Sequence, residues 1–482
     1  MGLDLWDYGV LGVYFLLIVG LGIWFGREEK DTRDYFLGGK SMPWMAVCLS
    51  ILATEASAIT FIGAPAQSFE RNFTYLQFAI GSLIGRILMA KLLISAYYKG
   101  KVTTVYEYLK QRFGMRTRDA GVVFFFVTRI LASGVRLLAI SMALSVVANI
   151  SLVQGILMVA GVALLYTLFG GIKAVIWTDV FQIMVFMGGA ALSIWFILSR
   201  LPGGLAGLME ATSGLHKFQV FDFRLTLKDA FVFLAAVVGG CFLTFSALGT
   251  DQGLAQRILT CRKVEQSQKA LILTGLIDFP IVFIFLSIGV GLFSFYRFFP
   301  DPNIPGRADY IFPFFMVSQL PSGIRGFLIA GVLAASMSSL DSSLAALSSS
   351  MVVDIYRPYM VPRASEKHYL FISRLFVIIF CLCLVAVALL CHQTKSVLIL
   401  GLKIGSFTYG SLLGIFLLGV TTRRGTCHTN ILAMLSSTLV VLAVYEFTSV
   451  SWPWYVVIGT VWTYGFSYIF GRSKSTFDEL KA

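Results

Sequence analysis

Two stretches of this sequence, SILATEASAITFIGAP at residues 50–65 and AASMSSLDSSLAALSSS at residues 334–350, place hydroxyl and carboxylate side chains inside otherwise apolar segments. Lipid offers no hydrogen bonds, so polar groups at membrane depth must face protein, water or an ion. One interpretation is a pair of buried polar helix faces. The other is a cation site made of hydroxyls, carbonyl groups and an acid, and we favour it because two such clusters occupy the same chain.

The composition around these stretches is that of a polytopic membrane protein. Hydrophobic residues make up 57% of the chain and charged residues 13%, and the mean hydropathy is +0.82, which no ordinary soluble domain shows. Apolar runs long enough to cross about 30 Å of hydrocarbon predict about thirteen membrane-spanning helices and an all-α fold. The expected spans are residues 5–26, 44–68, 76–98, 119–148, 152–170, 174–199, 228–249, 268–296, 323–352, 369–391, 396–420, 428–448 and 452–471.

Basic residues distinguish the two sides of the membrane. Lys and Arg gather in alternate loops, chiefly within residues 27–40, 99–118, 257–269, 357–367 and 423–424. The positive-inside rule assigns such loops to the cytoplasm, which predicts an external N-terminus and a cytoplasmic C-terminus. Basic loops facing anionic lipid also account for the net charge of +13, so we expect no nucleic-acid partner.

Several other classes of membrane protein are disfavoured. The seven cysteines show no disulfide or metal-ligand spacing, and the four histidines lie in loops or near span ends, which argues against a haem or copper oxidase. A channel would need repeated rings of like groups. A membrane-embedded solute sensor would need an output domain, and we expect none because the last span ends near residue 471. No enzyme activity is expected.

Seven blocks, in order along the chain, resemble the sodium:solute symporter family. They are DYFLGGKSMPWMAV (34–47), SILATEASAITFIGAP (50–65), VTTVYEYLKQRFG (102–114), YTLFGGIKAVIWTDVFQ (166–182), GTDQGLAQRIL (249–259), LAASMSSLDSSL (333–344) and SFTYGSLLGIFLLG (406–419). The pattern is similar to that of bacterial members that carry sialic acid or monocarboxylates. The resemblance implies sodium-coupled uptake of a small organic solute by alternating access. It also implies a location in the bacterial inner membrane, and we expect a monomer.

The resemblance further implies a LeuT-type inverted repeat of five plus five helices within a single membrane transport domain, residues 1–482. Residues 5–26 would form an extra N-terminal helix, residues 44–199 the first repeat and residues 228–420 the second. Residues 428–471 would add two C-terminal helices. In this arrangement the two polar stretches occupy matching positions in the two repeats.

A first sodium site is expected where the two polar stretches meet. Hydroxyl residues and a proline weaken the helix over residues 50–65, and a broken helix would present free carbonyl groups at the membrane midplane. The resemblance implies that sodium binds three carbonyl groups and two hydroxyls, those of Ala53, Ala56, Ala335, Ser338 and Ser339.

A second sodium site is implied by a subset of the family. Ser338, Asp341 and Ser342 lie on adjacent turns of one helix stripe, and Asp179 of the WTDVFQ block would complete the site. Asp341 departs from the pattern, because that subset often has Ser there. The alternative for Asp179 is a structural acid that caps or pairs near a helix end.

Arg129 and Arg136 suggest the class of solute. They lie seven residues apart, almost two helical turns, and so project from one helix face. An arginine at membrane depth costs roughly 2.5–3.5 kcal/mol unless it is paired or hydrated. Arg136 matches the position where sialic-acid-transporting members hold the substrate carboxylate. The alternative is an internal salt bridge from Arg136 to Glu55 or Asp278.

Neighbouring positions refine this interpretation. Ser57 and Thr60 of the broken helix are expected to donate hydrogen bonds to the solute. Ala247 stands where the sugar-transporting branch has a Tyr, so a carboxylate is favoured over a neutral sugar. Glu55 would repel an anion unless it were paired or protonated, and Arg86 is the candidate partner.

Overall fold

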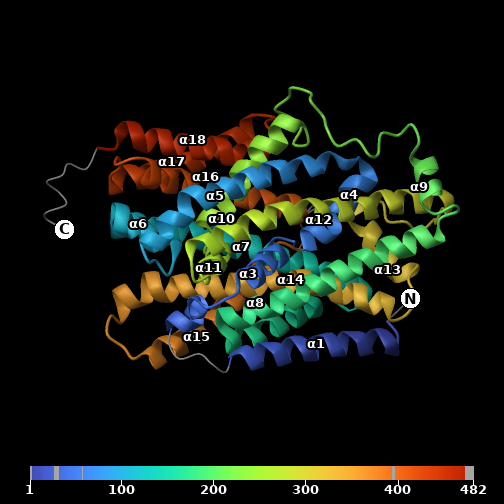
Figure 1. Ribbon diagram of the computed structural model, residues 1–482, viewed down its shortest axis with the longest axis horizontal. Helices are drawn as coiled ribbons and strands as arrows, with labels where there is room; N and C mark the ends of the chain where they lie inside the picture. Colours follow the sequence, from blue (N-terminus) through green and yellow to red (C-terminus); the bar gives the residue numbers. More distant parts are fainter. Residues whose placement is uncertain (1–2, 27–31, 57, 149, 393–396, 473–482) are drawn as a thin grey trace.

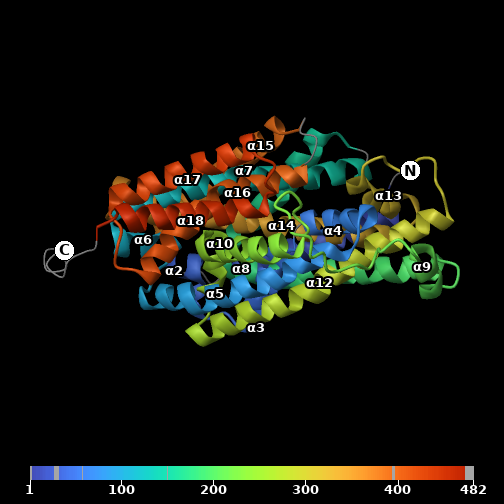
Figure 2. The ribbon, with the colours of Figure 1, turned by 90° about the horizontal axis from the view of Figure 1, so that it is seen from above.

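The chain folds into one elongated bundle, and most of its long helices lie along the longest axis of the molecule (Figures 1 and 2). The computed structural model describes residues 3–26, 32–56, 58–148, 150–392 and 397–472. Within these ranges the regular structure is helical, with no β-strand. Figure 1 shows that the first helix begins at one end of the bundle and that the last helix ends at the other.

Most long helices coincide with the expected spans. They are α1 Leu5–Gly26, α3 Trp44–Glu55, α4 Ala58–Glu70, α5 Gln77–Lys99, α7 Met115–Ala148, α8 Leu152–Arg200, α10 Gly240–Thr250, α12 Val264–Phe298, α14 Ile324–Ser350, α15 Glu366–Leu390, α16 Val397–Thr421, α17 Cys427–Phe447 and α18 Pro453–Phe470. Short helices join them, and these were not expected from the sequence. They are α2 Thr32–Leu37, α6 Val105–Phe113, α9 Leu205–Thr212, α11 Gln252–Ile258 and α13 Ile311–Ser318. The 3-10 turns are η1 Gly38–Lys40, η2 Phe73–Leu76 and η4 Ala308–Tyr310, and the π-helical segments are η3 Ala235–Gly239 and η5 Met351–Met360.

Nine helices in the described ranges are long and apolar enough to cross a membrane. The number becomes ten if the bent pair Trp44–Glu55 and Thr60–Glu70 forms one span. The other expected spans coincide with helices that do not meet this criterion, namely Leu152–Leu165, Ala235–Thr250 and α18. The described residues therefore have helices at all the expected positions, and nine or ten of these helices could cross a membrane by length and hydropathy.

Two expected boundaries differ in the structure. The separate spans 152–170 and 174–199 are joined in α8, which is interrupted only at Gly171, where φ is +42° and ψ is −164°. Glycine adopts this left-handed region without steric cost, so the chain can change direction there without a loop. In the expected span 228–249 the helix begins only after residue 232. The residues before it form a loop, which is held by a 2.7 Å hydrogen bond from the Phe233 N–H to the Asp222 carbonyl.

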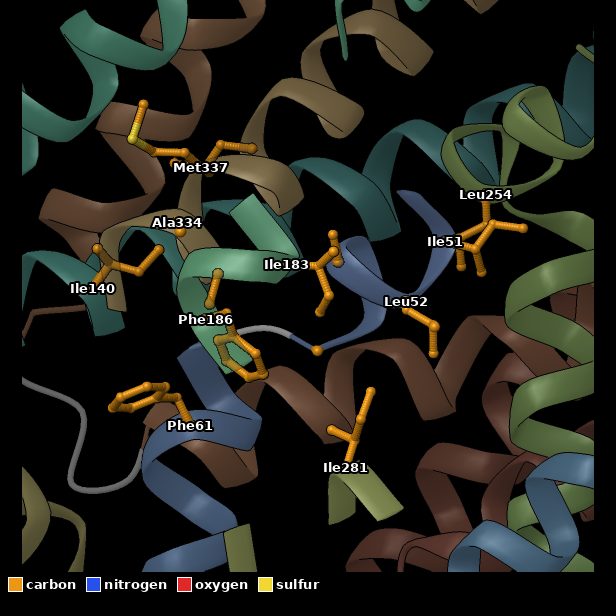
Figure 3. Packing of buried hydrophobic residues seen from close by; sticks show 14 of the residues in the cluster. Ile51, Leu52, Phe61, Ile140, Ile183, Phe186, Leu254, Ile281, Ala334 and Met337 are labelled. Atoms are coloured by element: carbon orange, nitrogen blue, oxygen red, sulfur yellow. The ribbon is translucent and has the colours of Figure 1, made fainter. Parts of the chain in front are cut away.

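Aromatic side chains fill the core next to the gap between α3 and α4. Phe61 of α4 stacks on Phe312 with ring centroids 5.0 Å apart, and Phe186 and Phe285 pack against it at 5.6 and 5.4 Å. Figure 3 shows Leu52 and Phe61 on either side of this gap, with labelled side chains of α8 and α14 beside them. The core therefore anchors both halves of the interrupted helix.

Candidate functional site

The helix formed by α3 and α4 is broken near the centre of the bundle. α3 ends at Glu55, and Ala56 leaves the helical conformation with φ −71° and ψ 69°. The segments on either side differ in direction by 57°. The Thr54 hydroxyl donates to the Ser50 carbonyl at 2.8 Å, a local side-chain bond of the kind that weakens helices. The predicted interruption is present, and it leaves the last carbonyl groups of α3 without partners in a continuing helix.

Hydroxyls of α14 meet these carbonyl groups. The Ser338 hydroxyl donates to the Ala53 carbonyl at 2.7 Å, and the Ser339 hydroxyl donates to the Thr54 carbonyl at 3.1 Å. Both hydroxyls also reach the Ala335 carbonyl, at 3.2 and 3.5 Å. The structure thus brings together four of the five residues predicted for the first sodium site.

The cluster fits a small hard cation carried as cargo. Its groups are carbonyl and hydroxyl oxygens, the ligands that such cations prefer. Ala56, the fifth predicted residue, is buried and is the first residue beyond α3. A hydroxyl proton rotates freely, so Ser338 and Ser339 can turn their lone pairs from the carbonyl groups toward an ion.

A second cluster lies on the same face of α14 and is centred on Arg257 of α11. The Arg257 guanidinium is 2.8 Å from Asp179 Oδ2 and 4.0 Å from Asp341 Oδ1, and it also donates to the Ser342 hydroxyl. Ser50 completes the group, because its hydroxyl is 2.5 Å from Asp179 Oδ2 and 2.8 Å from Arg257 Nε. The four residues predicted for the second sodium site therefore lie close together, with an arginine among them.

Arg257 was counted among the basic loop residues, but it lies in the short helix α11 and its side chain is only 1% exposed. The sequence feature that could have indicated burial of Arg257 is its position among apolar residues in the AQRIL segment, residues 255–259. The salt bridge to Asp179 also supports the structural role that the sequence left open for this acid. Asp179 Oδ1, however, is buried and has no hydrogen-bond partner among the described residues.

A cavity of about 250 Å³ opens beside the helix break. Thr60 and Arg136, two of the three residues predicted to bind solute, line it. The third, Ser57, lies outside the described residues. Ala247 also lines the cavity, so no tyrosine ring closes it at that position. The predicted binding residues that the structure describes therefore share one cavity.

The two arginines of α7 differ in their partners. Arg129 forms a 2.9 Å ion pair with Asp251, which also accepts a 3.1 Å hydrogen bond from the Tyr409 hydroxyl. Arg136 forms no ion pair or hydrogen bond with any residue in the described ranges. The alternative of a salt bridge from Arg136 to Glu55 or Asp278 is therefore not observed.

Those two acids share a different arginine. Arg86 of α5 is 2.6 Å from Glu55 Oε2 and 3.6 Å from Asp278 Oδ2, and it also donates to the Ser82 hydroxyl. The predicted partnership of Glu55 with Arg86 is confirmed. Asp278, named above only as an alternative partner of Arg136, joins the same group, and Glu55, Ser82, Arg86 and Asp278 all line the cavity.

Comparison with known proteins identifies the family. The model of the sodium:solute symporter family matches residues 35–436. The chain belongs to this family. It is 30% identical over 86% of its length to the human sodium/iodide cotransporter, of which it spans 66%. It is 29% identical over 94% of its length to the sodium/sialic acid symporter of Aliivibrio fischeri, of which it spans 90%.

A solved structure agrees with these relatives. The substrate-bound, outward-open state of a Na⁺-coupled sialic acid symporter superposes with a TM-score of 0.89 at 26% identity, covering 98% of this chain and 100% of that one. The symporter is thus a secondary transporter of the plasma membrane rather than an enzyme, and it couples a small organic solute to sodium.

Proposed function

We propose that the symporter imports a small organic solute bearing a carboxylate, by alternating access. Arg136 carries this proposal, because its guanidinium lines the cavity without an ionic partner among the described residues. A planar guanidinium can grip a carboxylate with two parallel hydrogen bonds, and such a grip would offset the cost of an unpaired charge at membrane depth. The similarity to a sialic acid symporter supports the same solute class.

Sodium would act at the junction of α3 and α14. An ion bound by Ala53, Ala56, Ala335, Ser338 and Ser339 would hold the end of the broken helix against α14. This would favour the outward-open state and complete the cavity before solute enters. Solute binding would then permit closure, so transport would depend on both ligands.

A second sodium would use the cluster around Arg257. The unpartnered Asp179 Oδ1 supports it, since a buried carboxylate oxygen costs free energy unless something binds it. Ser338, Asp341 and Ser342 would supply the remaining ligands. Arg257 would have to move part of the way out of the cluster, which makes this site dependent on the position of α11.

Several features of topology belong to the same proposal. We expect about thirteen crossings arranged as two inverted repeats of five, with one helix before and two after them. The N-terminus would face outside and the C-terminus the cytoplasm, in line with the loop charges. The symporter would act as a monomer that contacts only membrane lipid.

A thermal-shift screen of the purified symporter tests the solute class. Carboxylates, including sialic acid and short monocarboxylates, are compared with neutral sugars in sodium and in potassium buffer. We expect stabilisation by a carboxylate, in sodium only. Sodium-dependent stabilisation by an uncharged sugar, with no effect of any carboxylate, would contradict the proposal.

A further inference from the structure

The cavity wall has a second cluster of charged side chains, which we call the acidic pole. A solute whose only charged group is a carboxylate would not use it. Glu55, Arg86 and Asp278 come from α3, α5 and α12 and meet at its wall. Two carboxylates face one guanidinium, so the ionised group carries one negative charge in excess. A charge in excess at membrane depth needs a partner.

The two acids are more exposed to the space than the arginine is. The Arg86 side chain is 2% exposed, whereas those of Glu55 and Asp278 are 23% and 25% exposed. The ion pairs use Oε2 of Glu55 and Oδ2 of Asp278. The other carboxylate oxygens make no hydrogen bond with another described residue, so they can accept hydrogen bonds from a ligand.

Aromatic rings line the cavity together with this acidic pole. Tyr75, Phe78 and Trp452 all contribute to its wall, and the rings of Phe78 and Trp452 stack at 5.5 Å. Aromatic faces attract cations, and quaternary ammonium groups in particular are bound between such rings. The chemistry of this wall suits an organic cation.

The opposite charge lies on α7. Arg136 has no ionic partner in the described part of the chain, and Arg129 keeps its Nη2 and Nε without hydrogen-bond partners although its side chain is only 3% exposed. Both arginines line the same cavity as the acidic pole. A ligand that satisfied both walls would carry one negative and one positive group.

We propose that Glu55 and Asp278, held by Arg86, form an ammonium subsite, so that the solute is a small zwitterion of the amino-acid or betaine type. This inference rests on the proposed function, because Arg136 would hold the carboxylate of the same solute. The cavity volume of about 250 Å³ also favours a small solute, since pockets for drug-sized ligands span roughly 300–1,000 Å³.

Matched pairs of probes test the subsite on the full-length symporter in sodium buffer. The pairs are glycine betaine with 3,3-dimethylbutanoate, L-proline with cyclopentanecarboxylate, and L-alanine with 2-methylpropanoate. Within each pair the carboxylate and the shape are kept, and carbon replaces the cationic nitrogen. We expect a zwitterion to bind about 30-fold or more tightly than its carbon analogue, the effect of one lost buried ionic contact.

Variants then test whether Glu55 and Asp278 cause the preference for a zwitterion. Asp278→Asn keeps the shape of the side chain and should reduce the preference about tenfold or more, and Glu55→Gln is a second variant should the first not fold. Glu265→Gln is the matched control, because Glu265 lies on the same helix as Asp278 but is exposed and away from the cavity. It should keep the full preference.

The outcomes separate this inference from the proposed function. Equal binding of a zwitterion and its carbon analogue would overturn the ammonium subsite and leave the carboxylate proposal intact. A zwitterion preference that survives both variants would also overturn the ammonium subsite. The same holds if a variant lowers the number of bound sodium ions and leaves the zwitterion preference intact, because the acids would then bind a cation from solution. Failure of every carboxylate, with or without an amine, would contradict the proposed function itself.

Discussion

Replacing Arg136 should weaken solute binding without weakening the fold. Arg136→Lys keeps the positive charge but loses the planar fork, and Arg136→Gln loses both. Removing a buried charge-assisted contact costs about 2–5 kcal/mol, which is about 30-fold to 4,000-fold in Kd. We place the Lys variant near the lower limit and the Gln variant near the upper one. The ordering itself is informative, because a residue that only filled space would show no dependence on charge.

Stability gives the second half of this test. Arg136 has no ionic partner in the described ranges, so its replacement leaves no acid unpaired, and the melting temperature should stay within a few degrees of that of the wild type. Arg129→Gln is the contrasting variant, since it strands the buried Asp251 at a cost of about 3–5 kcal/mol. Melting temperature and carboxylate affinity are measured on the same preparations. Normal affinity together with a lowered melting temperature in Arg136→Lys would refute the assigned role.

Three further predictions concern the ion sites and the packing. Ser338→Ala combined with Ser339→Ala removes two oxygen ligands and should raise the sodium concentration for half-maximal uptake at least about tenfold, so unchanged sodium dependence would reject the first site. Asp179→Asn should lower the Hill coefficient for sodium toward one in vesicle uptake, whereas an unchanged sodium stoichiometry would leave this acid a structural role only. Gly289→Ala should lower the free energy of unfolding by about 1–3 kcal/mol, because the added Cβ would lie 2.1 Å from atoms of α4. Gly161→Ala is the control, since a Cβ there would have no atom within 4 Å. Equal melting temperatures of the two variants would contradict the close packing of Gly289 on α4.

The positions of the helices and of the break could be predicted because they follow from local composition. An apolar run of sufficient length folds as a helix in lipid whatever its neighbours are, and the hydroxyls around Thr54 weaken their own helix. The pairing of Glu55 with Arg86 was predictable for a similar reason. A carboxylate at membrane depth requires a cation, and the next span offered one.

The place of Arg257 could not be predicted, since it depends on tertiary structure. The positive-inside rule counts charges by position along the chain and does not register that the short α11 turns a side chain inward. A cation was expected beside Asp179 and Ser342, and the structure has a guanidinium there. The sodium expected at these residues stays a prediction, and the arginine is a partner of Asp179 that was not expected from the sequence.

The charge moved in each transport cycle connects the ion sites with the class of solute. A single carboxylate accompanied by one sodium ion moves no net charge, so the membrane potential would contribute nothing to its accumulation. A zwitterion accompanied by one sodium ion moves one charge, worth about 2.3 kcal/mol per 100 mV, and a second sodium adds the same amount again. The ratio of charge to solute in proteoliposomes, measured together with the ratio of sodium to solute, therefore reports the net charge of the solute itself. A difference of one indicates a carboxylate that leaves the Glu55–Asp278 pair unused. Equal ratios indicate a solute of zero net charge, which is the value expected for a zwitterion held between Arg136 and the Glu55–Asp278 pair.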